Sequence, residues 1–106
     1  MTFRRLVRVR QLRDGLRRRR RIRGRDLLLL HEEGRTWVVE DRCPHLGARL
    51  YRGHYDEGQL WCPRHGFCFA LDTGHRVSPP DTGAARDRLA CYEVLERDGW
   101  LGVELP

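Results

Sequence analysis

The chain has 106 residues, the size of one domain. Hydrophobic residues make up 40% and charged residues 34%, a balance typical of a folded globular domain. No apolar run, Leu27–Leu30 included, approaches the roughly 20 residues that a membrane-spanning helix needs. The N-terminal segment also lacks the apolar core of a signal peptide, so we expect a cytoplasmic protein with no membrane association.

The formal net charge is +6, and all 21 basic residues are arginine. Arginine makes bidentate contacts to carboxylates and phosphates. A positive field attracts nucleic acid, a membrane surface or an acidic protein, and the charge alone does not choose among these partners.

Short apolar runs separated by turn residues recur along the chain, a pattern typical of β-strands. In the first half, Asp14-Gly15 and Glu33-Gly34 supply the turns. The strands predicted there lie at Leu6–Val9, 16–23, Asp26–His31 and Arg35–Glu40, the last two as a hairpin.

In the second half, the segments 41–56 and 78–83 are expected to be loops, the latter with Pro79 and Pro80. Asp98-Gly99 is a strong hairpin turn signal. The predicted strands lie at Gln59–Trp61, Phe67–Leu71, Leu89–Glu96 and Trp100–Glu104, the last two as a hairpin. Many short strands without a helical stripe predict an all-β antiparallel sandwich or barrel.

Two fragments pair a thiol with an imidazole. They are Cys43-Pro-His45 and Cys62-Pro-Arg-His65, with sixteen residues between them. Thiolates and imidazoles are ligands that suit zinc or an iron–sulfur cluster. Gly47 and Gly66 follow the two histidines, where they permit a positive φ and a close backbone approach.

The pattern Cys-x-His, sixteen residues, Cys-x-x-His resembles that of Rieske [2Fe–2S] proteins. Cys43–Ala48 looks like the first cluster loop of that family, and Cys62–Gly66 looks like the second. Pro79 and Pro80 lie where the family carries a proline loop. The resemblance implies one Rieske domain over 1–106, with a cluster-binding subdomain at about 42–81 and a base domain in the remainder.

The resemblance also implies the roles of single residues. Cys43 and Cys62 would hold the inner iron of one [2Fe–2S] cluster, and His45 and His65 the outer iron. The residues expected to surround the cluster and to form the docking patch for partners are Leu46, Gly47, Arg64, Gly66 and Pro80.

Four neighbouring positions bear on the reduction potential. High-potential respiratory Rieske proteins have a disulfide between the cluster loops and hydroxyl donors to the cluster sulfurs. By motif alignment, Ala48 and Arg64 stand at the disulfide positions, and Phe67 and Phe69 stand at the hydroxyl positions. The resemblance therefore implies a low-potential protein, with a midpoint around −150 mV.

No further domain accompanies the motif, so the chain looks like a stand-alone Rieske-type ferredoxin, an electron carrier rather than an enzyme. The family implies a flavin-dependent reductase and a terminal ring-hydroxylating oxygenase as partners, and a monomer is the simplest state. The small subunit of an assimilatory nitrite reductase is the alternative within the family.

Two alternatives belong to other classes. One is a zinc-binding structural or interaction module, because zinc accepts the same four ligands. The other is a self-contained oxygenase, which needs an iron site of two histidines and a carboxylate. The remaining histidines, His31, His54 and His75, are scattered and are expected to be surface or hydrogen-bonded residues.

The Arg17–Arg21 run is expected on a sheet edge as a solvated face, where charge opposes aggregation. Steering of an acidic redox partner is the functional alternative. Nucleic-acid binding is not expected, since no groove-reading motif is present.

Cys68 and Cys91 are expected to be ordinary strand residues, with Cys68 open to oxidation beside a ligand loop. The three tryptophans are expected in the core: Trp37, Trp61 and Trp100.

Overall fold

The computed structural model describes residues 1–45, 47–84 and 87–106, which form three antiparallel sheets. The first sheet has the order β1-β11-β10, with β1 at Thr2–Arg8, β10 at Leu95–Arg97 and β11 at Trp100–Leu105. The second has the order β2-β3-β4-β9, with strands at Leu16–Ile22, Arg25–Glu32, Arg35–Glu40 and Cys91–Tyr92. The third has the order β5-β6-β7-β8, with strands at Tyr55–Asp56, Gln59–Trp61, Cys68–Ala70 and Arg76–Ser78. A short 3₁₀ turn, η1 at Val9–Gln11, follows β1.

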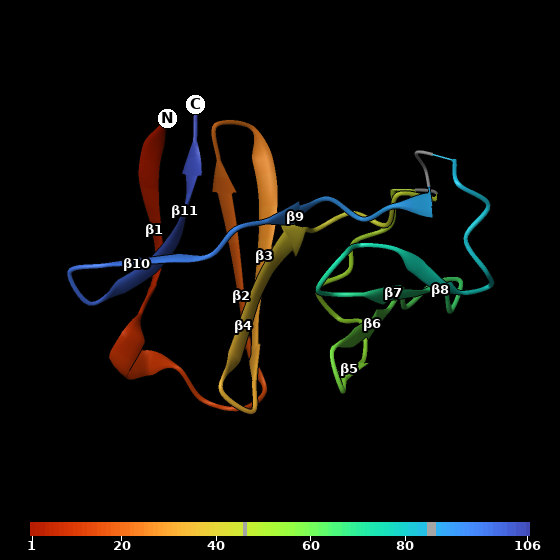
Figure 1. The fold of residues 1–106 in the computed structure, drawn as a ribbon, viewed down its shortest axis with the longest axis horizontal. Coiled ribbons are helices and arrows are strands. Elements are labelled where there is room, and N and C mark those ends of the chain that lie inside the picture. The colour runs from red at the N-terminus through yellow and green to blue at the C-terminus, as the bar shows by residue number, and fades with distance from the viewer. Residues whose placement is uncertain (46, 85–86) are drawn as a thin grey trace.

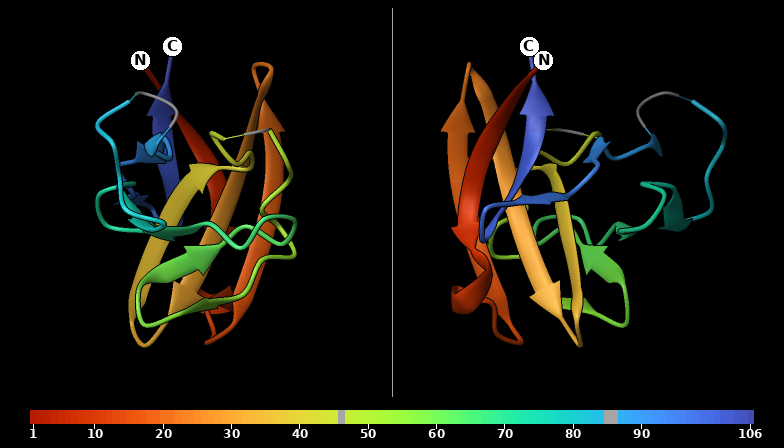
Figure 2. Two further views of the ribbon diagram at one scale, coloured as in Figure 1. Left: turned by 90° about the vertical axis from the view of Figure 1, so that its right-hand side faces the viewer. Right: turned by 60° about the vertical axis from the view of Figure 1, so that its left-hand side comes forward.

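The second sheet lies between the other two (Figure 1). Its strand β3 alternates: Leu27 and Leu29 join a core with β1 and β11, while Leu28 and Leu30 join a core with the third sheet. Because both faces of this sheet are covered, four consecutive leucines are buried. Figure 2 shows the same three layers from two further directions.

The all-β prediction is confirmed, and so is the β3–β4 hairpin, whose register pairs Glu32 with Arg35. The prediction of one strand over Leu89–Glu96 is wrong. This segment contributes β9 to the second sheet, where it pairs with β4, and β10 to the first sheet, where it pairs with β11. The chain crosses between the two layers here, so one continuous strand could not serve both sheets.

Two short strands were not predicted. β5 lies inside the segment expected as the loop 41–56, and β8 ends at Ser78, where the loop 78–83 was expected to begin. Neither strand exceeds three residues, so too few positions alternate to give a sequence signal.

The Arg17–Arg21 run lies on β2, the outermost strand of the second sheet, as expected. The prediction that the whole run forms a solvated face is, however, wrong. Arg17 donates hydrogen bonds to the carbonyls of Tyr51 and Gly53, and its guanidinium lies 4.8 Å from the Tyr55 ring centroid. Arg17 therefore anchors the segment between the first predicted ligand loop and β5 to the edge strand.

Arg19 extends this anchoring two residues further along β2. Its Nε pairs with Asp41 at 3.2 Å, and its guanidinium lies 5.0 Å from the Tyr51 ring centroid. Gly53, whose carbonyl accepts a hydrogen bond from Arg17, also packs closely on Trp61 of β6, since a Cβ there would lie 2.1 Å from the Trp61 carbonyl oxygen.

The tryptophans divide into two groups. Trp37 is buried, as expected, whereas Trp61 and Trp100 are only half-buried, so their expected core positions are wrong. Trp100 is covered by arginine: the Arg5 and Arg8 guanidinium carbons lie 5.2 and 4.3 Å from its ring.

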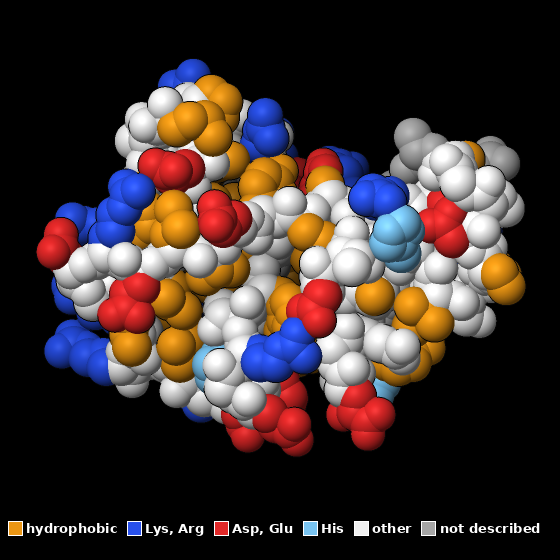
Figure 3. Space-filling model, in the orientation of Figure 1, with side chains coloured by type: hydrophobic (Ala, Val, Ile, Leu, Met, Phe, Trp, Pro, Cys, Tyr) orange, Lys and Arg blue, Asp and Glu red, His pale blue; other side chains and the backbone are white. Residues whose placement is uncertain are grey.

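On the face seen in Figure 3, charged side chains of both signs are interspersed with hydrophobic ones. Among the described residues, no helix has the length and apolar character that crossing a bilayer requires.

Arg17→Ala removes a charged donor from two carbonyl oxygens at once. We expect the free energy of unfolding, measured by urea denaturation, to fall by about 2 kcal/mol. The matched control is Arg20→Ala, an exposed arginine on the same strand, which should change it by less than about 0.5 kcal/mol. Equal effects of the two substitutions would contradict the anchoring role.

Candidate metal centre

The first predicted ligand loop follows β4 and closes through two backbone hydrogen bonds. The Cys43 N–H donates to the Ala48 carbonyl at 2.7 Å, and the Gly47 N–H donates to the Cys43 carbonyl at 2.7 Å. Gly47 has a φ of 75°, in the left-handed region that glycine adopts without a steric cost.

The second predicted ligand loop connects β6 to β7 and repeats this closure. The Cys62 N–H donates to the Phe67 carbonyl at 2.7 Å, and the Gly66 N–H donates to the Cys62 carbonyl at 2.9 Å. Gly66 has a φ of 70°. The two loops therefore share one backbone arrangement, in which cysteine comes first and glycine comes four residues later.

The cysteines of both loops lie in the core between the second and third sheets. Cys43 and Cys62 are each 1% exposed. They belong to the same buried cluster as Leu60 and Phe69. The two loops thus bring their thiols into a common, water-excluded layer.

The histidines of the two loops lie beside each other. The ring centroids of His45 and His65 are 5.7 Å apart, and the ring planes meet at 75°. Phe67 contacts both, with centroid distances of 4.3 Å to His45 and 6.4 Å to His65. His65 is exposed and His45 is half-buried, so the pair lies toward the surface and the thiols lie beneath.

The Nδ1 atom of His45 tests whether this donor set fits a metal group. This atom is buried and has no hydrogen-bond partner among the described residues. An unpaired buried ring nitrogen is costly, and coordination of a metal relieves that cost. The described residues hold no group of three or more His, Cys, Asp or Glu side chains around a single ion. In a [2Fe–2S] cluster with this donor set, each iron takes two protein ligands, so the two thiols and two imidazoles fit it.

Of the residues expected around the cluster, Gly47 and Arg64 line a shallow hollow together with Ala48 and His65. Gly66 lies in the second loop as described above. Leu46 lies outside the described residues.

Pro80 is exposed and is held in place by Arg76, a residue that the sequence analysis missed. The guanidinium of Arg76 donates to the carbonyls of Pro79 and Pro80, at 2.7 and 2.8 Å. It also lies 5.0 Å from the Phe67 ring centroid. Arg76 therefore connects the proline loop to the ring that touches both histidines.

Asp87 fixes the guanidinium from the other side. Its Oδ1 lies 2.7 Å from Nη1 of Arg76, and the two side chains are 2% and 9% exposed. Hydrogen bonds from the Thr82 hydroxyl and backbone N–H, followed by the charge of Arg76, hold the pKa of Asp87 below its usual range. The sequence carried no signal for this pair, because its members are eleven residues apart and follow no motif.

The other histidines do not gather into a second site. His31 is buried, with Nδ1 2.7 Å from the Thr36 hydroxyl. His54 stacks against Trp61 at 5.3 Å, and Nδ1 of His75 lies 3.0 Å from Asp81. These contacts match the expectation of surface or hydrogen-bonded residues.

Cys68 and Cys91 are free thiols on β7 and β9, as expected of strand residues. Cys68 is 2% exposed, and burial raises the pKa of its thiol. A buried thiol that stays protonated reacts slowly, which argues against the expected oxidation sensitivity.

The model of the Rieske [2Fe-2S] domain matches residues 2–93 of the chain. The chain is 36% identical to the 3-phenylpropionate/cinnamic acid dioxygenase ferredoxin subunit of Photorhabdus laumondii, over 70% of this chain and 68% of that protein. It is 39% identical to the phenoxybenzoate dioxygenase subunit alpha of Ectopseudomonas oleovorans, but spans only 20% of that longer protein.

Solved structures share the fold over nearly the whole chain. A ferredoxin of Sphingomonas yanoikuyae B1 superposes with a TM-score of 0.82 and 26% identity, over 99% of this chain and 100% of that one. A chain from a complex of oxygenase and ferredoxin in carbazole 1,9a-dioxygenase has a TM-score of 0.80 and 28% identity, over 94% and 99%. A protein described as the small subunit of an NADPH nitrite reductase has a TM-score of 0.75, over 99% and 100%, but only 17% identity, which shows a common fold alone.

The chain belongs to the Rieske [2Fe–2S] domain family. Its cofactor is accordingly a [2Fe–2S] cluster, as the sequence motif implied.

Arg76→Met removes the donors to both proline carbonyls and leaves Asp87 without its cation. We expect the proline loop to open and the cluster absorbance to decay severalfold faster in the presence of a chelator. The control is Arg88→Met, an exposed arginine whose guanidinium donates to the His75 ring and not to the proline loop, and it should decay at the wild-type rate. Equal rates of absorbance decay in the two variants would refute the role of Arg76 in holding the proline loop.

Cys68 should resist alkylation by iodoacetamide at pH 8 in the folded protein, because it is buried and burial raises its thiol pKa. Cys91, whose residue is exposed, should react first even though burial of its thiol also raises the pKa. Mass spectrometry of the labelled peptides measures both. Faster labelling of Cys68 than of Cys91 would contradict this order.

Proposed function

We propose that the chain is a one-electron carrier that takes electrons from a flavin-dependent reductase and delivers them to a terminal oxygenase. The observation that carries the proposal is the pair of matched loops, with two buried thiols and two adjacent imidazoles. Similarity to the dioxygenase ferredoxin subunit and to a chain of the carbazole dioxygenase complex supports an oxygenase as the acceptor.

In this proposal Cys43 and Cys62 hold the inner iron, and His45 and His65 hold the outer iron. The burial order supports the assignment, since the thiols are 1% exposed whereas His65 is exposed. When bound, the cluster accepts and releases one electron. The residues at about 42–81 then form the cluster-binding subdomain of a single domain.

The surrounding chain keeps water from the thiols and leaves one edge open. Phe67 covers both imidazoles, and Phe69 is fully buried beneath. The exposed His65 and the neighbouring Gly47 and Arg64 leave a short path for an electron to the surface. In this proposal the chain passes an electron and makes no bond in a substrate, so its role is that of a carrier and not of an enzyme.

The apolar neighbours support a low potential. Phe67 and Phe69 have no hydroxyl group with which to donate to a cluster sulfur. Hydrogen bonds to the sulfurs stabilise the reduced state, so their absence at these positions supports a midpoint around −150 mV.

Two other functions have less support. The nitrite reductase subunit shares the fold at 17% identity, and no residue-level observation favours that acceptor. A zinc module has less support because the described residues hold no group of three or more His, Cys, Asp or Glu side chains around a single ion. The free thiols of Cys68 and Cys91 suit a reducing compartment, which supports the proposed cytoplasmic location. A monomer is the simplest form of such a carrier.

Potentiometric titration of the reconstituted protein, followed by visible absorbance, tests this proposal. We expect a single one-electron midpoint around −150 mV. His65→Ala should abolish it by removing an iron ligand, while the control His54→Ala, an exposed histidine between the loops, should leave it unchanged. A midpoint above zero would refute the low-potential assignment, and an unchanged midpoint in His65→Ala would refute the ligand assignment.

A further inference from the structure

Two neighbouring hollows on the edge-strand side are each lined by three arginines, and both include Arg19. The first lies over β2 and contains Arg20, Arg21, Asp26 and Asp41. The second leads away from β2 and contains Arg49, Tyr51, Arg52 and Pro63. The shared Arg19 makes the two hollows one continuous surface.

This surface extends to the exposed imidazole. Pro63 belongs to the second ligand loop, and the next residue, Arg64, lines the hollow that contains His65. We call the six arginines along this line the arginine track: Arg19, Arg20, Arg21, Arg49, Arg52 and Arg64.

The aspartates beside the arginine track do not neutralise its positive charge. Asp26 is shared by Arg21, Arg42 and Arg49, at 3.2, 3.3 and 2.9 Å, and the hydrogen bond from Arg49 is the main cause of its lowered pKa. Asp41 pairs with Arg19. Six arginines against two aspartates leave an excess of four positive charges, out of a net +6 for the chain.

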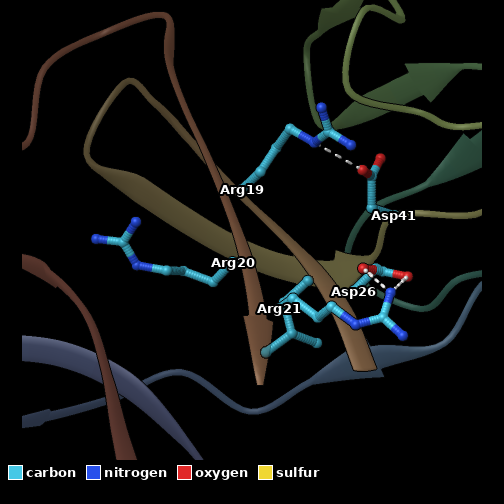
Figure 4. Close-up of a pocket in the computed structure, with 6 residues that line it drawn as sticks. Arg19, Arg20, Arg21, Asp26 and Asp41 are labelled. Carbon is cyan, nitrogen blue, oxygen red and sulfur yellow. Dashed lines mark hydrogen bonds and ion pairs between the residues drawn. The ribbon is translucent and has the colours of Figure 1, made fainter. Parts of the chain in front are cut away.

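Three guanidinium groups of the track are available to a partner. Among the described residues, Arg20, Arg52 and Arg64 are all exposed and form no ion pair. Figure 4 shows Arg19 and Arg21 turned toward the aspartates and Arg20 pointing away from them. The paired arginines are thereby held in place, while the unpaired ones extend into solvent.

We propose that the arginine track is the docking surface for an acidic patch on a redox partner protein. The inference rests on the proposed carrier function. It adds the polarity of the interface: this chain contributes the guanidinium groups, and the partner contributes carboxylates. Guanidinium groups bind carboxylates in a bidentate manner, and complementary charge accelerates encounter and orients His65 toward the acceptor.

A protein fits this surface better than a nucleic acid does. The described residues contain no α-helix that could enter a groove. Tyr51, the aromatic residue that lines the second hollow, is covered by the Arg19 guanidinium and is not free to stack on a base. The track also ends at the imidazole from which an electron would leave, where a redox protein must approach.

Small redox probes of opposite charge test the polarity of this exit. The reduced holoprotein is mixed with anionic tris(oxalato)cobaltate(III) or with cationic hexaamminecobalt(III), and stopped-flow absorbance follows the transfer of one electron to each cobalt ion. With added KCl we expect the rate constant to fall for the anionic probe and to rise for the cationic probe.

The double variant Arg52→Glu/Arg64→Glu reverses the unpaired charges on the side of the track toward the second ligand loop, and every proposed ligand and ion pair is kept. We expect its low-salt rate with the anionic probe to fall on the order of tenfold. Arg13→Glu, exposed in the connection before β2, is the control for a change of charge and should alter the rate less than about 1.5-fold in total, against about 1.8-fold per unit of charge in the double variant. A short polyglutamate peptide should slow the anionic probe in wild type and not in the double variant.

Rates that are insensitive to salt, or equal losses per charge in Arg13→Glu, would overturn the docking surface. Binding of duplex DNA by the wild-type protein at about 0.15 M salt, together with loss of that binding in the double variant, would also overturn it. The track would then bind a nucleic acid and not a protein. The electron paramagnetic resonance signal of the wild type and of each variant separates failure of the docking surface from failure of the proposed carrier function. An intact signal with salt-insensitive rates rejects the arginine track and keeps the carrier, whereas loss of the signal in wild type rejects the carrier.

Discussion

The backbone closure shared by the two ligand loops is the constraint on which the site depends. In each loop the cysteine N–H donates to the carbonyl five residues ahead, and the glycine N–H donates back to the cysteine carbonyl. This closure turns each thiol inward and leaves the imidazole on the outer side. The backbone has a positive φ at Gly47 and Gly66. A residue with a Cβ atom would be strained in this conformation, so glycine is favoured at both positions. The histidine offset differs by one residue between loops, yet both rings reach the same place.

The sheets hold these loops in register with each other. The first loop follows β4 of the second sheet, whereas the second loop belongs to the third sheet, so packing between these two layers sets the distance between the ligand pairs. Arg17 reinforces the packing of these layers, because its hydrogen bonds hold the segment that follows the first ligand loop against β2. Arg76 acts on the opposite side by tying the proline loop toward Phe67.

The ligand loops were predictable because their chemistry is local: each needs a cysteine, a histidine and a glycine within five residues. The β3–β4 hairpin was predictable for the same reason. The crossing between β9 and β10 was not, since each strand is too short to alternate and its partner is chosen by packing. The roles of Arg17 and Arg76 were also hidden. In a chain with 21 basic residues, all arginine, only tertiary contacts separate an anchor from a solvated charge.

Low-temperature electron paramagnetic resonance of the dithionite-reduced protein shows whether two thiols and two imidazoles hold one [2Fe–2S] cluster. Iron and zinc are counted on the same sample. We expect two irons per chain and a rhombic signal whose average g value lies below that of the free electron. A silent spectrum with one zinc per chain would contradict this expectation and would make the matched loops a structural metal site.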